Sequence, residues 1–268
     1  MSSLNPPELA GMNTMIPGSP KPPSILAVRR ICALAAFVVC AIASMGPAHA
    51  QIAIPGTRIV YPAAQREVVV PIKNMSSAPV LVQAWISDGA PDQLPEASKA
   101  PFVLAPPVVR LESGKDNYLR IRSIPTIAPR DSVEHLYWLN ILGVPSKQSD
   151  ASQNVLELAV RSRYKVLYRP EGLAPPGPDQ DKALTFRLVG EGDVRRLQVS
   201  NRSPYVINLG SLVVLNGARE EELDNPFVPP MADIEVVLPP GMAATAEVRF
   251  DWIDDEGRLH RSSRSIAR

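Results

Sequence analysis

Few side chains in this sequence could take part in nucleophilic or metal chemistry. Beyond residue 50 the histidines are His135 and His260, and that part of the sequence contains no cysteine. A cysteine–histidine pair and a cysteine-based zinc site are therefore excluded there. No Gly-x-Ser-x-Gly elbow marks a catalytic serine, and His135 lies in an alternating segment that is typical of a structural role. We expect no catalytic residue, no metal site and no cofactor, and thus a protein that is not an enzyme.

A different chemistry, the binding of another polypeptide, is indicated by one long segment. Residues 154–168 alternate in polarity, and this run is about three times the length of a typical strand. Leu156, Leu158 and Val160 share one face, and the Lys165 that follows is too basic for a core. If this strand has an open edge, the edge is an aggregation hazard unless it is presented to another chain. The alternative is a long central strand that a second sheet buries.

The overall composition narrows the class of protein. The 268 residues include 28 Lys and Arg against 27 Asp and Glu, so a nucleic-acid-binding surface is not expected. Val, Ile and Leu are abundant and there are 29 prolines. This combination favours short strands joined by turns over long helices.

The first fifty residues have the pattern of a secretory signal peptide. An uncharged apolar run of 15 residues, 31–45, follows Arg29 and Arg30 and precedes Ala48-His49-Ala50, which predicts cleavage after Ala50. The run is shorter than the roughly 20 residues that span a bilayer, so we expect no membrane span after cleavage. The proline-rich residues 1–24 are either an extended n-region or an over-long gene start. Removing residues 1–50 leaves 25 basic and 26 acidic residues and no cysteine for a disulfide.

Strand-like alternation continues through the remaining sequence. It predicts seven strands within about 115 residues, which is the signature of an immunoglobulin-like sandwich. A Pro- and Gly-rich linker at 169–178 precedes a second, smaller set of strands. The sequence therefore predicts an all-β fold with two immunoglobulin-like β-sandwich domains, 51–170 and 171–268. The expected strands are 57–61, 67–73 (with Pro71 at an edge or a bulge), 80–86, 108–111, 117–122, 135–144, 155–168, 184–189, 194–200, 206–215, 234–238, 244–253 and 259–266.

Five segments, taken in order and spacing, resemble the periplasmic chaperones of chaperone–usher pilus assembly. The resemblance covers nearly all of residues 51–268 and implies two immunoglobulin-like domains in a boomerang arrangement. The segments are Thr57-Arg58-Ile59-Val60-Tyr61-Pro62, Pro79 to Trp85, Pro106 to Leu111, Glu134 to Ile141, and Arg161 to Pro170.

The resemblance implies roles for the matching residues. Arg58 and Lys165 match the two basic residues that anchor a pilus subunit's C-terminal carboxylate. Leu156, Leu158 and Val160 match the alternating positions of the donor strand that enter the subunit's groove.

A second set of matches implies an ion-pair network between the domains, formed by Glu134, Arg169 and Asp255. A shift of one residue in the alignment would move the last role to Asp254. Residues 131–134 hold one more residue than the corresponding family segment, which affects the match at Glu134. The loop at 145–153 is short and polar, which resembles the short-loop subgroup of these chaperones.

The resemblance implies a periplasmic chaperone that binds pilus subunits by donor-strand complementation, prevents their aggregation and delivers them to an outer-membrane usher. No ATP is required on this interpretation. An exposed donor strand would also offer a surface for self-association. The alternative is a secreted two-domain immunoglobulin-like adhesion or structural module, in which Arg58 and Lys165 would tolerate substitution by alanine.

Overall fold

This computed structural model describes residues 51–146, 158–190, 195–217, 219–224, 226–242 and 247–267. The predicted signal peptide, Leu156 and most of the loop at 145–153 lie outside these ranges. The predictions made for them, including the short-loop subgroup, remain predictions. Within the described ranges, no helix has the length and apolar content that crossing a membrane requires.

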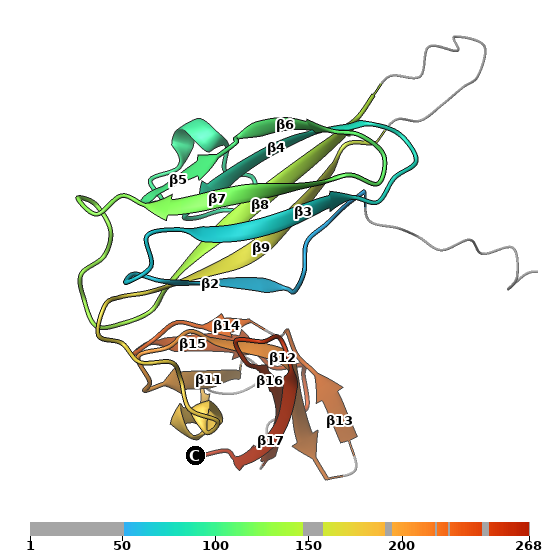
Figure 1. Cartoon of the computed structure of the whole chain (residues 1–268). Helices are drawn as coiled ribbons and strands as arrows, with labels where there is room; N and C mark the ends of the chain where they lie inside the picture. The colour runs from blue at the N-terminus through green and yellow to red at the C-terminus, as the bar shows by residue number, and fades with distance from the viewer. Residues whose placement is uncertain are drawn as a thin grey trace, which may run out of the picture. The chain divides into compact units, whose positions relative to one another are not determined.

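The N-terminal part of the described chain consists of two sheets (Figure 1). One sheet has the order β1-β3-β7-β5, and the other has the order β2-β9-β8-β4-β6. Their bounds are β1 (Ile52–Ala53), β2 (Arg58–Pro62), β3 (Val68–Asn74), β4 (Val80–Ser87), β5 (Phe102–Ala105), β6 (Val108–Leu111), β7 (Asp116–Ser123), β8 (His135–Pro145) and β9 (Val160–Arg169), with a short 3-10 turn, η1 (Pro95–Ala97).

Alternating apolar residues of both sheets meet in one core. Tyr61, Leu119 and Leu139 are fully buried in it, and Val166 of β9 joins them. Burial of each such side chain contributes about 1.5–3 kcal/mol relative to exposure. Polar side chains are therefore expected on the outer face of the sheet that contains β2, β9, β8 and β4.

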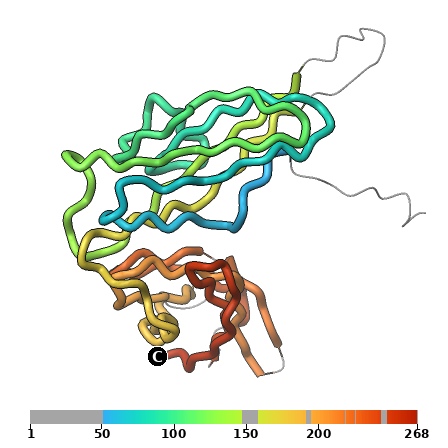
Figure 2. The backbone as a smooth tube through the Cα atoms, viewed as in Figure 1, coloured from blue at the N-terminus to red at the C-terminus, as the bar shows by residue number. Residues whose placement is uncertain are grey.

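The C-terminal part repeats this plan with a second core. One sheet has the order β10-β11-β15, and in the other β12 lies between β13 and β16 and also pairs with β14, while β17 pairs with β16. This part of the chain runs from yellow through orange to red in Figures 1 and 2. Leu197, Leu212 and Phe250 are buried between them. The all-β prediction of two immunoglobulin-like sandwiches is confirmed. The bounds are η2 (Gln180–Ala183), β10 (Leu184–Val189), β11 (Arg196–Asn201), β12 (Ile207–Asn216), β13 (Arg219–Glu222), β14 (Phe227–Val228), β15 (Asp233–Val237), β16 (Glu247–Ile253) and β17 (Leu259–Ser265).

The long strand expected at 155–168 is shorter in the structure. β9 begins at Val160, and Leu158 precedes it outside any strand. The pairing with β8 ends where Val160 meets Gly143, although β8 itself continues to Pro145, so residues 158 and 159 leave the sheet before their neighbouring strand does. Pro71 lies on β3, which pairs fully with β7 and meets the two-residue β1 only at its far end, so the predicted edge position is confirmed.

One side-chain arrangement occurs at the same place in both domains. Asn74 and Asn201 end β3 and β11, and both are fully buried. Each amide Nδ2 donates to three backbone carbonyls at 2.7–3.2 Å. Each Oδ1 accepts from the backbone N–H and the hydroxyl of the serine two residues later, Ser76 or Ser203. The two sandwiches thus close the equivalent corner with the same pattern of five hydrogen bonds.

Candidate functional site

Two cations face each other at the start of the parallel pair β2–β9. Arg58 is the first residue of β2 and is in register with Lys165 of β9. Because Ile59 and Tyr61 point into the core, Arg58 points to the opposite face, and Lys165 does so for the same reason beside Val166. The alternation that builds the sandwich thereby brings both side chains to one point on its outer face.

The neutral partners of these cations come from the second domain. Arg58 Nη1 donates to the carbonyl of Ile253 at 3.1 Å, and Lys165 Nζ donates to Oδ1 of the buried Asn208 at 2.5 Å. In the described part of the chain neither cation forms an ion pair, and Arg58 Nε is buried without a hydrogen-bond partner. Donors of this kind, held in place and lacking a negative partner, are suited to an anion.

The electrostatics of the pair also favour an anionic ligand. Burial, and then the like charge of Arg58, lower the pKa of Lys165 to about 8. Burial likewise lowers the pKa of Arg58, although Asp255, Asp254 and Glu134 oppose it. A carboxylate placed between the two cations would relieve their repulsion and raise the pKa of Lys165 again.

Two aromatic rings complete the surroundings of Lys165. Its Nζ lies 5.9 Å from the ring centroid of Trp138 and 5.6 Å from that of Phe227, and the two rings meet edge to face at 6.4 Å. Cation–π attraction holds the ammonium in place and still leaves room for a further charge-assisted hydrogen bond. Sequence reasoning missed Asn208 and Phe227, because no local pattern links them to Lys165 in the other domain.

The edge of β9 next to this pair is open. β2 pairs only with residues Lys165 to Arg169. The preceding residues, Val160 to Tyr164, pair with β8 on one side, and no described strand pairs with them on the other. Of the three predicted groove-binding residues, Val160 is 46% exposed on this edge, Leu158 is 62% exposed just before it, and Leu156 is outside the described ranges.

The three residues of the predicted ion-pair network are in contact. Arg169 donates to Glu134 Oε1 at 2.7 and 3.1 Å, and to the two carboxylate oxygens of Asp255 at 3.0 and 3.2 Å. Glu134 also accepts from the backbone N–H of Val206 at 3.0 Å. Burial raises the pKa of Glu134, although Arg169 and the Val206 N–H oppose this. Burial would lower the pKa of Arg169, but the two carboxylates outweigh it and raise that pKa.

Asp254, the alternative to Asp255, lies in a different set of contacts. Its carboxylate accepts from the backbone N–H and Nε of Arg258, both at 2.8 Å, and pairs with His260 Nε2 at 2.7 Å. It therefore braces the turn between β16 and β17, and its neighbour Asp255 is the residue that contacts Arg169.

Comparison with known proteins agrees with this geometry. Residues 51–174 match the family model "Pili and flagellar-assembly chaperone, PapD N-terminal domain", and residues 179–264 match "Pili assembly chaperone PapD, C-terminal domain". The chaperone protein FimB/FhaD of Bordetella pertussis is 35% identical over 249 residues, which cover 89% of this chain and 98% of that relative. The chain belongs to the pili-assembly chaperone family.

Solved structures of similar chaperones support the same assignment. The CupB2 chaperone of Pseudomonas aeruginosa is 32% identical with a TM-score of 0.66, and the match covers 80% of this chain and all of that one. The SafB chaperone of Salmonella enterica, solved in complex with the SafA pilin, is 27% identical with a TM-score of 0.65, and the match covers 82% of this chain and 98% of that one.

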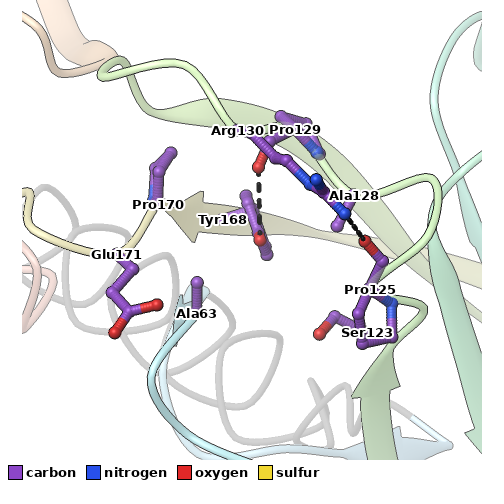
Figure 3. A pocket seen from close by; sticks show the side chains of 9 residues that line it. All are labelled: Ala63, Ser123, Pro125, Ala128, Pro129, Arg130, Tyr168, Pro170 and Glu171. Carbon is purple, nitrogen blue, oxygen red and sulfur yellow. Dashed lines mark hydrogen bonds between the residues drawn. The ribbon is translucent and has the colours of Figure 1, made fainter.

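A separate cavity of about 390 Å³ lies where β9 leaves the N-terminal domain of this chaperone. Figure 3 shows the Tyr168 hydroxyl aimed at the Pro129 carbonyl and Arg130 reaching the Pro125 carbonyl, with Glu171 well apart from Arg130. No residue of the predicted site lines this cavity. Within the described residues there is also no group of three or more His, Cys, Asp or Glu that could hold a metal ion.

Proposed function

We propose that this pili-assembly chaperone binds the C-terminal strand of a pilus subunit along the open edge of β9. The subunit's terminal carboxylate lies between Arg58 and Lys165. The observation that carries the proposal is the position of these two cations. Both lie where the open edge of β9 ends, and within the described residues their side chains bond to neutral oxygens and not to a carboxylate.

The direction of the bound strand follows from the position of β2. From Lys165 onward β2 already occupies this edge of β9, so a guest strand has only the edge of Val160 to Tyr164 available. A guest whose last residue reaches Lys165 must therefore run parallel to β9 and end where β2 begins. The guest strand and β2 then lie end to end along one side of β9.

Apolar side chains of the chaperone supply the rest of the binding free energy. Leu156, Leu158 and Val160 would enter a groove of the subunit, and burial of each contributes about 1.5–3 kcal/mol. Such a clamp is strong enough to protect a subunit and can be reversed when a competing strand replaces it. No nucleotide and no catalytic step are required, in keeping with a family of binding proteins.

The remaining assignments concern location and transfer. Residues 1–50 act as the signal peptide, and the mature chain of two domains, 51–170 and 171–268, works in the periplasm and passes subunits to an outer-membrane usher. The buried contacts of Glu134, Arg169 and Asp255 fix the geometry between the domains more than they add net stability. The open edge of β9 can also pair with a second copy of the chain when no subunit is bound.

The test is co-purification of a candidate pilin from periplasm with the mature chain and with Lys165→Ala. We expect the variant to retain at most about a tenth of the pilin, because one half of the carboxylate anchor is lost. Lys73→Ala is the matched control, since Lys73 is an exposed lysine on the other sheet with a loose 3.7 Å contact to Asp116. Thermal melts establish that both variants fold.

The same experiment distinguishes the proposed function from the alternative. If Lys165→Ala and Arg58→Ala retain as much pilin as Lys73→Ala does, the anchor is wrong. If the unaltered chain also fails to bind any of several pilins, the secreted adhesion or structural module becomes the better interpretation.

A further inference from the structure

One buried polar side chain points away from the core of the C-terminal domain. Ile207 and Leu209 of β12 are both buried in that core, so Asn208 between them points to the opposite face of the strand. A polar side chain on an outer face is normally exposed, yet Asn208 is only 1% exposed. Lys165 of the other domain lies against it, since Lys165 Nζ donates to Asn208 Oδ1. The buried amide is therefore turned toward the carboxylate anchor.

Two residues in register with Asn208 also contact this anchor. β12 pairs with β14 at Phe227 and with β16 at Ile253, so Phe227, Asn208 and Ile253 form a row across three neighbouring strands. The Phe227 ring lies beside the Lys165 ammonium, and the Ile253 carbonyl accepts a hydrogen bond from Arg58. The row thus holds both cations of the anchor from the side of the C-terminal domain.

Each of these contacts with the two cations is uncharged. Asn208 offers an amide oxygen, Ile253 a backbone carbonyl and Phe227 an aromatic ring. An ammonium has three N–H donors, and Asn208 Oδ1 accepts from one of them. The remaining donors and the full positive charge of Lys165 stay available to a carboxylate. The row therefore fixes the position of the ammonium without competing with an anionic ligand.

A carboxylate at the position of Asn208 would act differently. Aspartate has almost the same shape as asparagine, but its charge would form an internal ion pair with Lys165. A terminal carboxylate of a subunit would then have to break this pair before it could bind. The neutrality of the side chain at position 208 is thus a condition for binding and not only a matter of packing.

We propose that Asn208 is a positioning residue of the carboxylate anchor, which orients the Lys165 ammonium and leaves its charge available to the subunit's terminal carboxylate. Asn208 acts through Lys165 and not through the subunit. The observation that carries this inference is the hydrogen bond between a buried, uncharged amide and a cation that has no carboxylate partner within the described residues. The inference rests on the proposed function, because it concerns the same anchor.

Two substitutions of similar size at position 208 test the inference. The ligand is an extended eight-residue peptide rich in Val and Thr, prepared as the free acid and as the amide, and calorimetry measures its affinity for the mature chain. Asn208→Asp should weaken binding of the acid about tenfold or more, because the new carboxylate pairs with Lys165. Asn208→Leu should weaken it about twofold to tenfold, because the ammonium is no longer held in place. The amide should bind all variants alike.

The pH dependence separates positioning from a purely structural effect. Burial and the charge of Arg58 hold the pKa of Lys165 at about 8, so affinity for the acid should fall above that pH in the unaltered chain. The carboxylate introduced by Asn208→Asp raises the pKa of Lys165, so the weakened affinity should no longer fall there. In Asn208→Leu the fall should remain, because Lys165 gains no negative partner. Local misfolding at position 208 would not flatten the curve.

Asn216→Asp is the matched control for the added charge. Asn216 ends the same strand, and its amide donates to the Gly241 carbonyl, so this variant should bind like the unaltered chain. Thermal melts establish which variants fold. If the folded Asn208 variants bind the acid as tightly as Asn216→Asp does, or if affinity still falls above about pH 8 in Asn208→Asp, the inference is wrong although the anchor stands. If the unaltered chain binds acid and amide alike, the anchor itself is wrong.

Discussion

The affinity of this site for a terminal carboxylate should fall as the pH rises through about 8. Burial and the charge of Arg58 lower the pKa of Lys165 from 10.5 to about 8, so the empty site loses a proton near that pH. A bound carboxylate favours the charged ammonium and raises the pKa again. Binding therefore takes up a proton above pH 8, and the affinity is constant below that pH and declines above it.

The size of the effect follows from the same change in pKa. A full return from about 8 to 10.5 would correspond to about 3.4 kcal/mol. Lys165 is only partly buried, and solvent screening reduces the interaction to about 1–2 kcal/mol. The expected loss of affinity between pH 7 and pH 10 is then roughly fivefold to thirtyfold.

Calorimetric titration of one peptide, as free acid and as amide, measures this dependence between pH 6.5 and 10. The acid should lose affinity above pH 8, whereas the amide should show no such slope. Lys165→Arg is the control, because a guanidinium keeps its charge throughout this range and should flatten the curve for the acid. A flat curve for the unaltered chain, or the same slope with the amide, would refute the reasoning about Lys165.

Three further predictions concern residues around the site. Arg169→Ala leaves the carboxylate of Glu134 buried without its cation, so urea unfolding should show a loss of about 3–5 kcal/mol, whereas a loss below about 1 kcal/mol would contradict this. Although burial opposes ionisation, hydrogen bonds from His260 and Arg258 hold the pKa of Asp254 well below its usual range. The ionised Asp254 carboxylate therefore stabilises the fold above pH 4, and this stabilisation is lost as the pH falls further. Thermal melts of Asp254→Asn should depend less on pH in this range than thermal melts of the unaltered chain. Phe227→Ala removes a ring beside the Lys165 ammonium and should weaken binding of the free-acid peptide about twofold to fivefold, with no change for the amide.

Much of the fold could be predicted from the sequence, because burial on one face imposes a two-residue period. The strands β3, β4 and β8 begin and end within one residue of the predicted bounds for this reason. β13, with the sequence Arg-Glu-Glu-Glu, could not be found in this way, because it has no apolar residue and exists only through its pairing with β12. β5 is four residues between prolines and also escaped notice.

The candidate site was less accessible to sequence reasoning. Pattern alone treats Arg58 and Lys165 as ordinary surface charges, and only the resemblance to a family singled them out. Asn208 lies 43 residues from Lys165 in the chain, so only the folded arrangement of the two domains brings them together. The choice between Asp254 and Asp255 as the contact of Arg169 likewise depended on the geometry of one turn.

The equivalent corners at Asn74 and Asn201, one in each domain, restrict the host cells in which this protein can be produced. Both asparagines begin an Asn-x-Ser sequence, which eukaryotic secretory pathways recognise as a glycosylation signal. In the folded chain each amide nitrogen is buried and donates to three carbonyls, so it is closed to enzymes. A sugar attached before folding would occupy a nitrogen that the corner needs and could not be packed inside. Yeast or mammalian secretion should therefore yield glycosylated, misfolded chains, whereas bacterial export leaves both corners free to close.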